Sequence, residues 1–481
     1  MQSSLKVKNS IPRRAKIVVT LGPATDGLER ELVASGLDVA RLNFSHGDLN
    51  EHRRRCSAIR SAAAELGRSV AVMQDLPGPK MRTGRLVGGG PVELVAGQTL
   101  VIASGDVAGD CTRVSTTYAA LAHDVQPGKT LLLDDGHIRL TVLEIAGEEV
   151  RTRVEEGGQL GEHKGINAPG TAISATVPTA SDVRDLRFGL SELEVDYVAL
   201  SFIRTPGEVR AVRKLVRELK RDTPLVVKLE RQEAIDNLDA ILKVADAVMV
   251  ARGDLGVELA PERVPALQKR IIRRANALRM PVITATQMLE SMTHDETPTR
   301  AEAADVANAV WDGTDAVMLS GETAVGRHPL LVLQMMDRIV RSAEATPSDS
   351  ASLIPRRESS HEAAITHAAR VLAEDIQARA IVGLTRTGRT ARLLSSGRAS
   401  PPIYAFSPDP HVCNRLSLWW GVSPIVQAMG RTIEDNVHAM ETALCARGAV
   451  EPGDLVVLTG SQPFERGVHT NFVHFHRVGE R

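Results

Sequence analysis

The sequence predicts an α/β protein that consists of a (β/α)8 TIM barrel, an inserted small β-barrel lid domain and a C-terminal open α/β domain. Three observations support this fold class. The 481 residues suffice for about three domains of ordinary size. Aromatic residues make up only 3% of the chain, which favours aliphatic α/β packing. Short runs rich in β-branched residues alternate with amphipathic helical patterns in two separate blocks.

The first block contains eight short runs rich in β-branched residues, which predict eight strands. Between them lie segments with apolar residues three and four positions apart, as in amphipathic helices. Eight such β/α units fit a closed parallel barrel. The predicted strands are 16–20, 39–43, 70–75, 197–201, 225–229, 247–251, 281–285 and 316–320, and the clearest helices are 50–66, 206–220, 262–278 and 299–311.

The region 84–170 breaks this alternation. It is rich in glycine, has alternating strand patterns at 139–145 and 150–154, and contains no convincing long helix. We therefore expect a small β domain inserted after the third barrel strand, with the chain returning to the barrel near Ser174. Such an insertion can act as a lid over the strand ends.

A stretch dense in Ser, Pro and charged residues, 346–360, predicts a linker to a second α/β block. The resulting domain prediction has four segments. They are 1–83, the first part of the barrel; 84–170, the lid; 171–345, the second part of the barrel; and 346–481, a C-terminal α/β domain. In that last domain we expect helices at 361–375 and 432–445 and strands at 380–384, 403–406 and 455–458.

Composition excludes several classes of function. The 58 basic and 59 acidic residues nearly cancel, which argues against nucleic acid as a partner. No stretch approaches the roughly 20 apolar residues of a membrane span, and the N-terminus is polar, so we expect a cytoplasmic protein without a membrane partner. The cysteines lie far apart, which predicts buried thiols rather than disulfides or a metal site; they are Cys56, Cys111, Cys413 and Cys445.

Polar residues gather at the carboxyl ends of the predicted strands, where β/α barrels place their chemistry. Taken singly, each of them is more easily explained by a structural salt bridge. Their convergence on one barrel mouth favours an active site. The set comprises Arg41, Asn43, Ser45, His46, Asp75, Lys228, Glu230, Arg252, Gly253, Asp254, Thr284, Thr286, Gln287, Ser320 and Glu322.

Glu230 and Asp254 end adjacent predicted strands, so their carboxylates could share one hard cation such as Mg²⁺. Lys228 lies two residues before Glu230 and points to the same face. The glycines of the segment Gly253-Asp254-Leu255-Gly256 could let the backbone approach an anion, with a helix following; the alternative is an ordinary glycine turn. Gly128-Lys129-Thr130 lacks the upstream glycine of a phosphate-binding loop and predicts a tight turn.

Several long motifs resemble those of pyruvate kinase, specifically the bacterial type with Lys in place of Glu in the K⁺-site motif. The resemblance runs from about Arg14 to the C-terminus. It implies glycolytic transfer of a phosphoryl group from phosphoenolpyruvate to ADP, giving pyruvate and ATP, with Mg²⁺, a homotetrameric assembly and allosteric control by a phosphorylated metabolite. The motifs are AKIVVTLGPA at 15–24, RLNFSHG at 41–47, LLDDG at 132–136, KGIN at 164–167, VARGDLGVE at 250–258 and TQMLESM at 286–292.

By matching position, the resemblance implies that Glu230 and Asp254 ligate Mg²⁺. Lys228 and Arg41 would stabilise the transferring phosphoryl group, whose charge spreads over its equatorial oxygens. The backbone at Gly253 and Asp254 would hold the substrate carboxylate, and Thr286 would lie near the enolate carbon. Lys228, Arg41 and Thr286 are therefore the expected catalytic residues.

The residues matching the nucleotide site are Asn43, His46, Arg82 and, from the lid, Lys164. His46 could instead be a turn residue that caps the following helix. Lys164 could be a plain surface lysine, although lid closure would carry its charge toward the phosphates.

The resemblance departs from many family members at their K⁺ site, whose motif is Asp-Thr-Lys-Gly-Pro-Glu. Here the segment 75–80 reads DLPGPK. The ammonium of Lys80 can supply the charge of a bound K⁺, so we expect activity without K⁺. The alternative is that Lys80 pairs with a carboxylate while K⁺ binds through Asn43, Ser45 and Asp75.

A candidate allosteric site follows a predicted strand of the C-terminal domain and precedes a helix. Hydroxyls, a glycine and a helix N-terminus form a plausible phosphate cradle there, for which the resemblance implies a sugar-phosphate effector. The alternative is a helix cap followed by solvated arginines. The residues are Thr385, Arg386, Thr387, Gly388, Arg389 and Thr390.

Two rival functions remain open at this point. A Mg²⁺-dependent lyase or aldolase acting on pyruvate enolate would also use a Glu/Asp metal pair and an arginine, but it would not need the lid. A metabolite sensor that binds a sugar phosphate through the C-terminal domain would be expected to lack a catalytic residue. Pyruvate formation that depends on ADP distinguishes the three.

Overall fold

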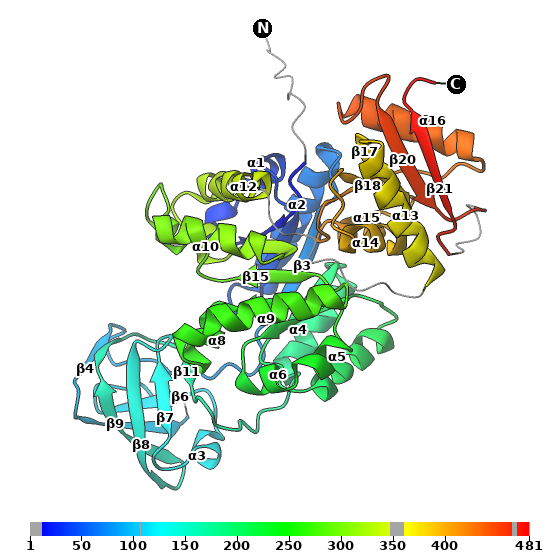
Figure 1. The fold of residues 1–481 in the computed structure, drawn as a ribbon. Helices are drawn as coiled ribbons and strands as arrows, with labels where there is room; N and C mark the ends of the chain where they lie inside the picture. The colour runs from blue at the N-terminus through cyan, green and yellow to red at the C-terminus, as the bar shows by residue number, and fades with distance from the viewer. Residues whose placement is uncertain (1–11, 106, 347–359, 464–468, 481) are drawn as a thin grey trace.

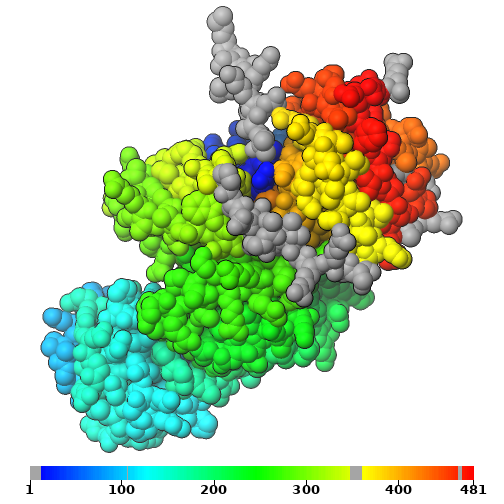
Figure 2. All heavy atoms as spheres, viewed as in Figure 1, coloured from blue at the N-terminus to red at the C-terminus, as the bar shows by residue number. Residues whose placement is uncertain are grey.

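The computed structural model describes residues 12–105, 107–346, 360–463 and 469–480. The chain forms three domains (Figure 1). The β/α barrel lies in the middle, with an inserted sheet domain at one end and a C-terminal α/β domain at the other. In the space-filling view the inserted domain is a separate lobe beside the barrel (Figure 2). Within the described residues, no helix combines the length and apolar character needed to cross a membrane.

The predicted eight-stranded parallel barrel is confirmed. Its strands pair in the order β1-β2-β3-β12-β13-β14-β15-β16, and β16 returns to β1. All are parallel, and nearly every residue in them is buried, as expected for strands covered on both faces. The bounds are β1 (Lys16–Leu21), β2 (Val39–Asn43), β3 (Ala71–Leu76), β12 (Tyr197–Leu200), β13 (Leu225–Leu229), β14 (Ala247–Ala251), β15 (Val282–Ala285) and β16 (Ala316–Leu319).

Helices surround the barrel, and capping boxes fix the first turn of several of them, as in the Asp48/Glu51 pair of α2. The helix expected at 262–278 begins as a 3-10 turn, Pro261–Arg263, before α9, because prolines lack the N–H groups that an earlier start would use. The helices are α1 (Glu29–Ala34), α2 (Leu49–Glu65), α4 (Ala180–Ser191), α5 (Pro206–Glu218), α6 (Gln232–Asp236), α7 (Leu238–Leu242), α8 (Arg252–Glu258), α9 (Val264–Ala277), α10 (Arg300–Trp311), α11 (Gly321–Ala324) and α12 (Pro329–Ala345).

The domain inserted between β3 and β12 has a six-stranded sheet, ordered β11-β7-β8-β9-β5-β6, and a two-stranded sheet, β10-β4. Isolated bridges from Arg82 to Gly165 and from Thr83 to Thr116 connect the two edges of the larger sheet. Its only described helix is α3 (Leu121–Asp124). The strands are β4 (Val92–Leu94), β5 (Thr99–Ser104), β6 (Arg113–Thr116), β7 (Thr130–Leu133), β8 (Ile138–Ala146), β9 (Glu149–Glu156), β10 (Gly158–Leu160) and β11 (Ile166–Asn167).

The C-terminal domain is an open five-stranded sheet, β19-β18-β17-β20-β21, with helices packed on it. Two edge strands were not predicted: β19 is interrupted by Pro424, and β21 alternates apolar residues with His and Arg. Most of the predicted linker lies outside the described residues. The elements are β17 (Ala380–Leu384), β18 (Ile403–Ser407), β19 (Val422–Val426), β20 (Leu455–Gly460), β21 (Phe472–Arg477), α13 (His361–Asp375), α14 (Arg389–Ser396), α15 (Pro410–Leu416) and α16 (Ile433–Ala446).

The expectation for the cysteines was half wrong. Cys56 and Cys413 are buried, but Cys111 and Cys445 are exposed. Cys111 lies in a loop of the inserted domain, and Cys445 lies near the end of α16, so neither position faces a core. All four thiols are free, as predicted.

The C-terminal domain closes the floor of the barrel. Leu418, in the loop after α15, is fully buried within the cluster of apolar side chains inside the barrel. The Tyr197 hydroxyl donates to the Arg415 carbonyl at 2.6 Å, and Ser417 Oγ donates to the Ser69 carbonyl at 2.8 Å. The loop before β19 thus supplies an apolar plug that the barrel strands alone do not provide.

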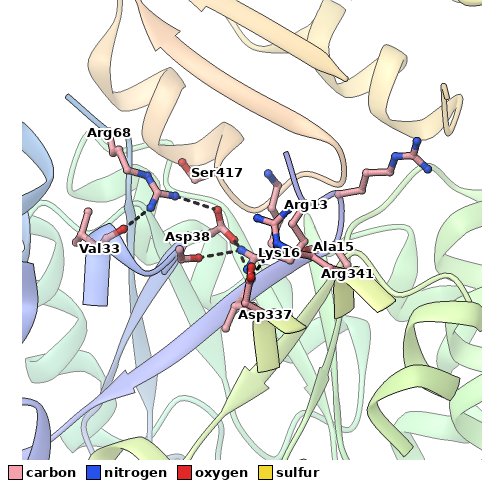
Figure 3. A network of polar contacts seen from close by, with 12 residues as sticks. Arg13, Ala15, Lys16, Val33, Asp38, Arg68, Asp337, Arg341 and Ser417 are labelled. Carbon is pink, nitrogen blue, oxygen red and sulfur yellow. Dashed lines mark hydrogen bonds and ion pairs between the residues drawn. The ribbon is translucent and has the colours of Figure 1, made fainter. Parts of the chain in front are cut away.

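A polar network of barrel residues lies beside this plug, next to the C-terminal domain (Figure 3). Arg13 pairs with Asp38 and, at 2.7 Å, with Asp337. The buried Lys16 ammonium donates to the Val422 carbonyl at 2.6 Å. Of these contacts, the hydrogen bond from Lys16 to Val422 joins the barrel to the C-terminal domain and gives the buried ammonium a partner there.

We predict that Leu418→Ala destabilises the protein by about 2–5 kcal/mol, because it leaves a cavity in the barrel floor. Leu278→Ala is the matched control, since Leu278 is 46% exposed and its loss should cost less than about 0.5 kcal/mol. Urea unfolding followed by circular dichroism measures both. Equal midpoints for the two variants would contradict the role of Leu418 as a plug.

Candidate active site

Asp75 at the end of β3 holds two cations side by side. Arg41 Nε donates to Asp75 Oδ2 at 2.7 Å, and Lys228 Nζ lies 3.5 Å from Asp75 Oδ1. The carboxylate is 1% exposed. Burial by itself would raise the pKa of Asp75, but Lys228 and Arg41 hold that pKa below its ordinary value. The sequence placed Asp75 among the polar residues of the barrel mouth and in the monovalent-cation region, but its contacts with Arg41 and Lys228 were missed.

Lys228, on β13, is enclosed by oxygen atoms. Its Nζ lies 2.8 Å from Glu230 Oε1 and donates to Ser201 Oγ at 2.8 Å. Burial alone would lower the pKa of Lys228, but the Asp75 and Glu230 carboxylates raise it above its ordinary value. A positive charge is therefore fixed at the barrel mouth, next to the guanidinium of Arg41.

Glu230 follows β13, and Asp254 lies in the first turn of α8, so the two carboxylates end adjacent strands, as predicted. The Phe202 amide donates to Glu230 Oε2 at 2.8 Å, while the buried Oε1 accepts no hydrogen bond of good geometry. Burial raises the pKa of Glu230 despite the Lys228 ammonium, and the charge of Asp254 adds to the increase.

These features fit a divalent cation, which would neutralise two neighbouring carboxylates and share the oxygen atoms of Glu230 with Lys228 and the Phe202 amide. The described residues contain no cluster of three or more His, Cys, Asp or Glu side chains arranged for a metal. The pair of Glu230 and Asp254 would thus leave the other coordination positions to substrate oxygens and water, which suits Mg²⁺.

The expected position of the following helix was wrong. The segment Gly253–Gly256 lies within α8, which begins at Arg252 directly after β14. Arg252 anchors this start, because its guanidinium donates to the Thr286 carbonyl at 2.8 Å and pairs with Asp305 at 2.6 Å. This support by Asp305 was not visible in the sequence, since the two residues are far apart in the chain.

Thr286 and Gly253 are in direct contact. The Gly253 amide donates to Thr286 Oγ1 at 2.8 Å, and that hydroxyl donates to the Ala285 carbonyl at 2.7 Å. Thr286 and Gln287 adopt the left-handed region, with φ of 66° and 54°. Two consecutive non-glycine residues in this region are unusual and occur mainly at functional sites.

A cavity of about 350 Å³ opens between the barrel mouth and the inserted domain. Three of the four predicted nucleotide residues line it: His46, Arg82 and Lys164. Lys164 Nζ pairs with Asp134 of the same domain at 2.8 Å. Asn43 is not among the lining residues; its Oδ1 accepts from the Ser45 amide at 3.2 Å.

His46 does not cap the following helix, because Asp48 does so by accepting from the amides of Asn50 and Glu51. The imidazole instead lines the cavity. Burial lowers the pKa of His46, and the charges of Arg82 and Lys80 lower it further. His46 is thus a neutral hydrogen-bonding group at pH 7.

Lys80 is largely buried beside the same mouth. Burial and the Lys228 charge lower its pKa, while the charges of Asp254, Glu230 and Asp75 act in the opposite direction. Within the described residues, its ammonium forms no ion pair with a carboxylate at 4.0 Å or less. The fixed pairing considered as the alternative role of Lys80 is therefore not observed.

Two arginines that sequence reasoning missed hold the chain where it returns from the inserted domain. Arg204 donates to the carbonyls of Ile173 and, at 2.8 Å, Ala175. Arg231 donates to the Thr171 carbonyl at 3.1 Å. Each arginine follows a barrel strand and lines the cavity. This position after a strand is the feature of the sequence from which both could have been predicted as site residues.

The predicted allosteric segment surrounds a second cavity, of about 200 Å³. Gly388, with φ of 82°, is the N-cap of α14, and the segment lies between β17 and this helix as expected. Thr385 is 5% exposed, and its hydroxyl has no hydrogen-bond partner in the described part of the chain. Arg389 Nη2 lies 2.7 Å from Glu362 Oε2.

Comparisons with known proteins agree along nearly the whole chain. Residues 12–333 match the family model described as "Pyruvate kinase, barrel domain", and residues 363–476 match "Pyruvate kinase, alpha/beta domain". The pyruvate kinases of Mycobacterium tuberculosis H37Rv and Corynebacterium glutamicum are 44% and 45% identical to it, over 97% of this chain and 99% and 98% of their own. A pyruvate kinase structure from Cryptosporidium parvum matches with a TM-score of 0.88 and 36% identity, over 97% of this chain and 96% of that one.

We predict that Glu230→Gln and Asp254→Asn each weaken Mn²⁺ binding by about tenfold or more, because an amide supplies no charge to a hard cation. Electron paramagnetic resonance of free Mn²⁺ measures the binding. Asp246→Asn is the control, since Asp246 pairs with Arg213 before β14, at the opposite end of the barrel. Unchanged binding in both site variants would contradict the metal assignment.

Proposed function

Since the chain belongs to the pyruvate kinase family of glycolytic phosphotransferases, we propose that its barrel mouth transfers the phosphoryl group of phosphoenolpyruvate to ADP. The P–O bond to the enolate oxygen breaks, a bond to the terminal phosphate oxygen of ADP forms, and the enolate takes a proton at carbon to give pyruvate. The observation that carries the proposal is the buried Asp75 carboxylate, which fixes the charges of Arg41 and Lys228 beside Glu230.

Arg41 and Lys228 are proposed to bind the transferring phosphoryl oxygens. Transition-state charge on these oxygens is stabilised best by cations that are already in place. The hydrogen bonds from Arg41 to Thr20 and Asp75 and from Lys228 to Ser201 support this role, because they hold the two cations without solvent rearrangement. Mg²⁺ held by Glu230 and Asp254 would add further positive charge there.

The backbone at Gly253 and Asp254 is proposed to bind the substrate carboxylate, with Thr286 beside the enolate carbon. Because the Gly253 amide donates to Thr286 Oγ1, substrate binding through this amide would free an acceptor lone pair of the threonine oxygen, while the hydroxyl proton would still be held by the Ala285 carbonyl. Thr286 would then be available to a proton path toward the enolate.

Asn43, His46, Arg82 and Lys164 are proposed as the nucleotide site. A phosphate approaching Lys164 must compete with Asp134, its present partner. Arg82 donates to the His163 carbonyl at 3.3 Å, so both cations belong to the inserted domain or its junction. Movement of that domain would bring them toward ADP, which is the proposed role of a lid.

We further propose a cytoplasmic homotetramer controlled by a sugar phosphate. The effector would bind in the cavity lined by Thr385, Arg386, Thr387, Arg389 and Thr390, with Gly388 forming the turn. Assembly is supported by β21, an edge strand of the C-terminal sheet that carries Phe475, which is 59% exposed. Exposed apolar groups on an unpaired edge favour contact with another chain.

The kinase proposal and its independence of K⁺ are tested together. We expect equal rates of pyruvate formation from phosphoenolpyruvate, ADP and Mg²⁺ with and without K⁺, because the Lys80 ammonium supplies the positive charge. Lys80→Glu is expected to make the rate depend on K⁺. Activity of the unmodified enzyme only with K⁺ would retain the kinase and contradict the role of Lys80; no pyruvate under any condition would contradict the kinase.

Thr385→Ala combined with Thr387→Ala is expected to abolish activation by hexose phosphates, because phosphate oxygens lose two hydroxyl donors of the cavity wall. The concentration of hexose phosphate that gives half-maximal activation is the measurement. Thr442→Ala, in α16 with its hydroxyl bonded to the His438 carbonyl, is the control. Full activation of the double variant would remove this segment from the effector site.

A further inference from the structure

A buried carboxylate already lies in the proposed effector cavity. Glu362 is in the first turn of α13, two residues after the N-cap Ser360, and is 4% exposed. Its side chain lines the cavity of about 200 Å³ together with Thr385 and Arg389. The allosteric segment predicted from the sequence did not include it, because Glu362 precedes that segment by more than twenty residues.

Glu362 bridges two parts of the cavity wall. Its Oε2 lies 2.7 Å from Arg389 Nη2 on α14, and its Oε1 is in hydrogen-bond contact with His469 Nδ1 from the segment before β21. Beside this bridge, the hydroxyls of Thr390 and Thr470 are 2.8 Å apart. The hydrogen bond from Arg389 lowers the pKa of Glu362 despite its burial, so the carboxylate is ionised at neutral pH.

Within this cavity Glu362 has the position and charge expected of an anionic ligand. Arg389 is the first residue of α14, where a phosphate would meet both its guanidinium and the helix N-terminus. Thr385 offers a nearly buried hydroxyl without a partner among the described residues. An entering phosphate therefore finds a donor at Thr385, but Arg389 is already paired with an internal anion.

We propose that Glu362 is a built-in competitor for the effector phosphate and so sets the effector concentration to which the enzyme responds. This inference rests on the effector site proposed above. A phosphate that binds must take Arg389 from Glu362 and must tolerate the like charge of that carboxylate beside it, both of which weaken binding. A ligand that displaces Glu362 also releases its bridge to His469.

Glu362→Gln tests the proposal, because the amide keeps the size and the acceptor oxygen but removes the charge. We expect hexose phosphates to bind this variant about tenfold more tightly than the unmodified protein. Calorimetric titration of the full chain with glucose 6-phosphate and with fructose 1,6-bisphosphate gives the dissociation constants. Glu374→Gln is the matched control: Glu374 is on the same helix and pairs with Arg370 at 2.6 Å, outside the cavity.

A double-mutant cycle separates competition for Arg389 from a general effect of charge. The increase in hexose phosphate affinity caused by Glu362→Gln is expected to disappear when Arg389→Met is also present, because the guanidinium for which Glu362 and the phosphate compete is then absent. An equal increase in affinity with and without Arg389→Met would overturn the proposal. Equal dissociation constants for the unmodified protein and Glu362→Gln would also overturn it.

The two proposals fail in different ways. If the unmodified protein binds hexose phosphate and Glu362→Gln binds it no better, only the role of Glu362 is overturned. If neither protein binds these probes, and both unfold at the same temperature, the effector site itself is overturned and the inference with it. Binding by Glu362→Gln alone supports both.

Discussion

The buried carboxylate of Asp75 is the interaction on which the rest of the barrel mouth depends. Two cations as close as Arg41 and Lys228 would repel each other strongly where little water is present. Asp75 lies between them, and Glu230 is paired with Lys228 on the other side. With this arrangement, the fold can keep two positive charges at one place for a phosphoryl group, at the expense of placing two carboxylates beside them.

The same constraint explains why the site needs several strands. Asp75 ends β3, Arg41 lies on β2, Lys228 on β13 and Ser201 directly after β12, so the four side chains meet because these four strands are neighbours in the barrel. The barrel also needs a filled interior. Leu418 from the C-terminal domain completes that filling at the opposite end, so the stability of the barrel and the attachment of the second domain are not independent.

Much of this could be predicted from the sequence, because the periodicity of eight β/α units fixes which residues end strands, and barrels place chemistry at those ends. This is why Lys228, Glu230 and Asp254 were identified before their contacts were known. The sequence could not reveal Leu418 as a plug, Glu362 as a partner of Arg389, or Asp305 as a support for Arg252. Each depends on residues far apart in the chain, and no local pattern encodes which loop reaches which neighbour.

Hydrogen bonds from Arg204 and Arg231 attach the chain that returns from the inserted domain to the ends of the barrel strands. Both arginines bind main-chain carbonyls, those of Thr171, Ile173 and Ala175, so the attachment does not depend on side chains in that segment. Arg231 also directly follows Glu230 in the chain. The position of the inserted domain is thus fixed by the same strand ends that hold Lys228 and Glu230, and any displacement of that domain acts on the chain immediately beside the metal-binding carboxylate.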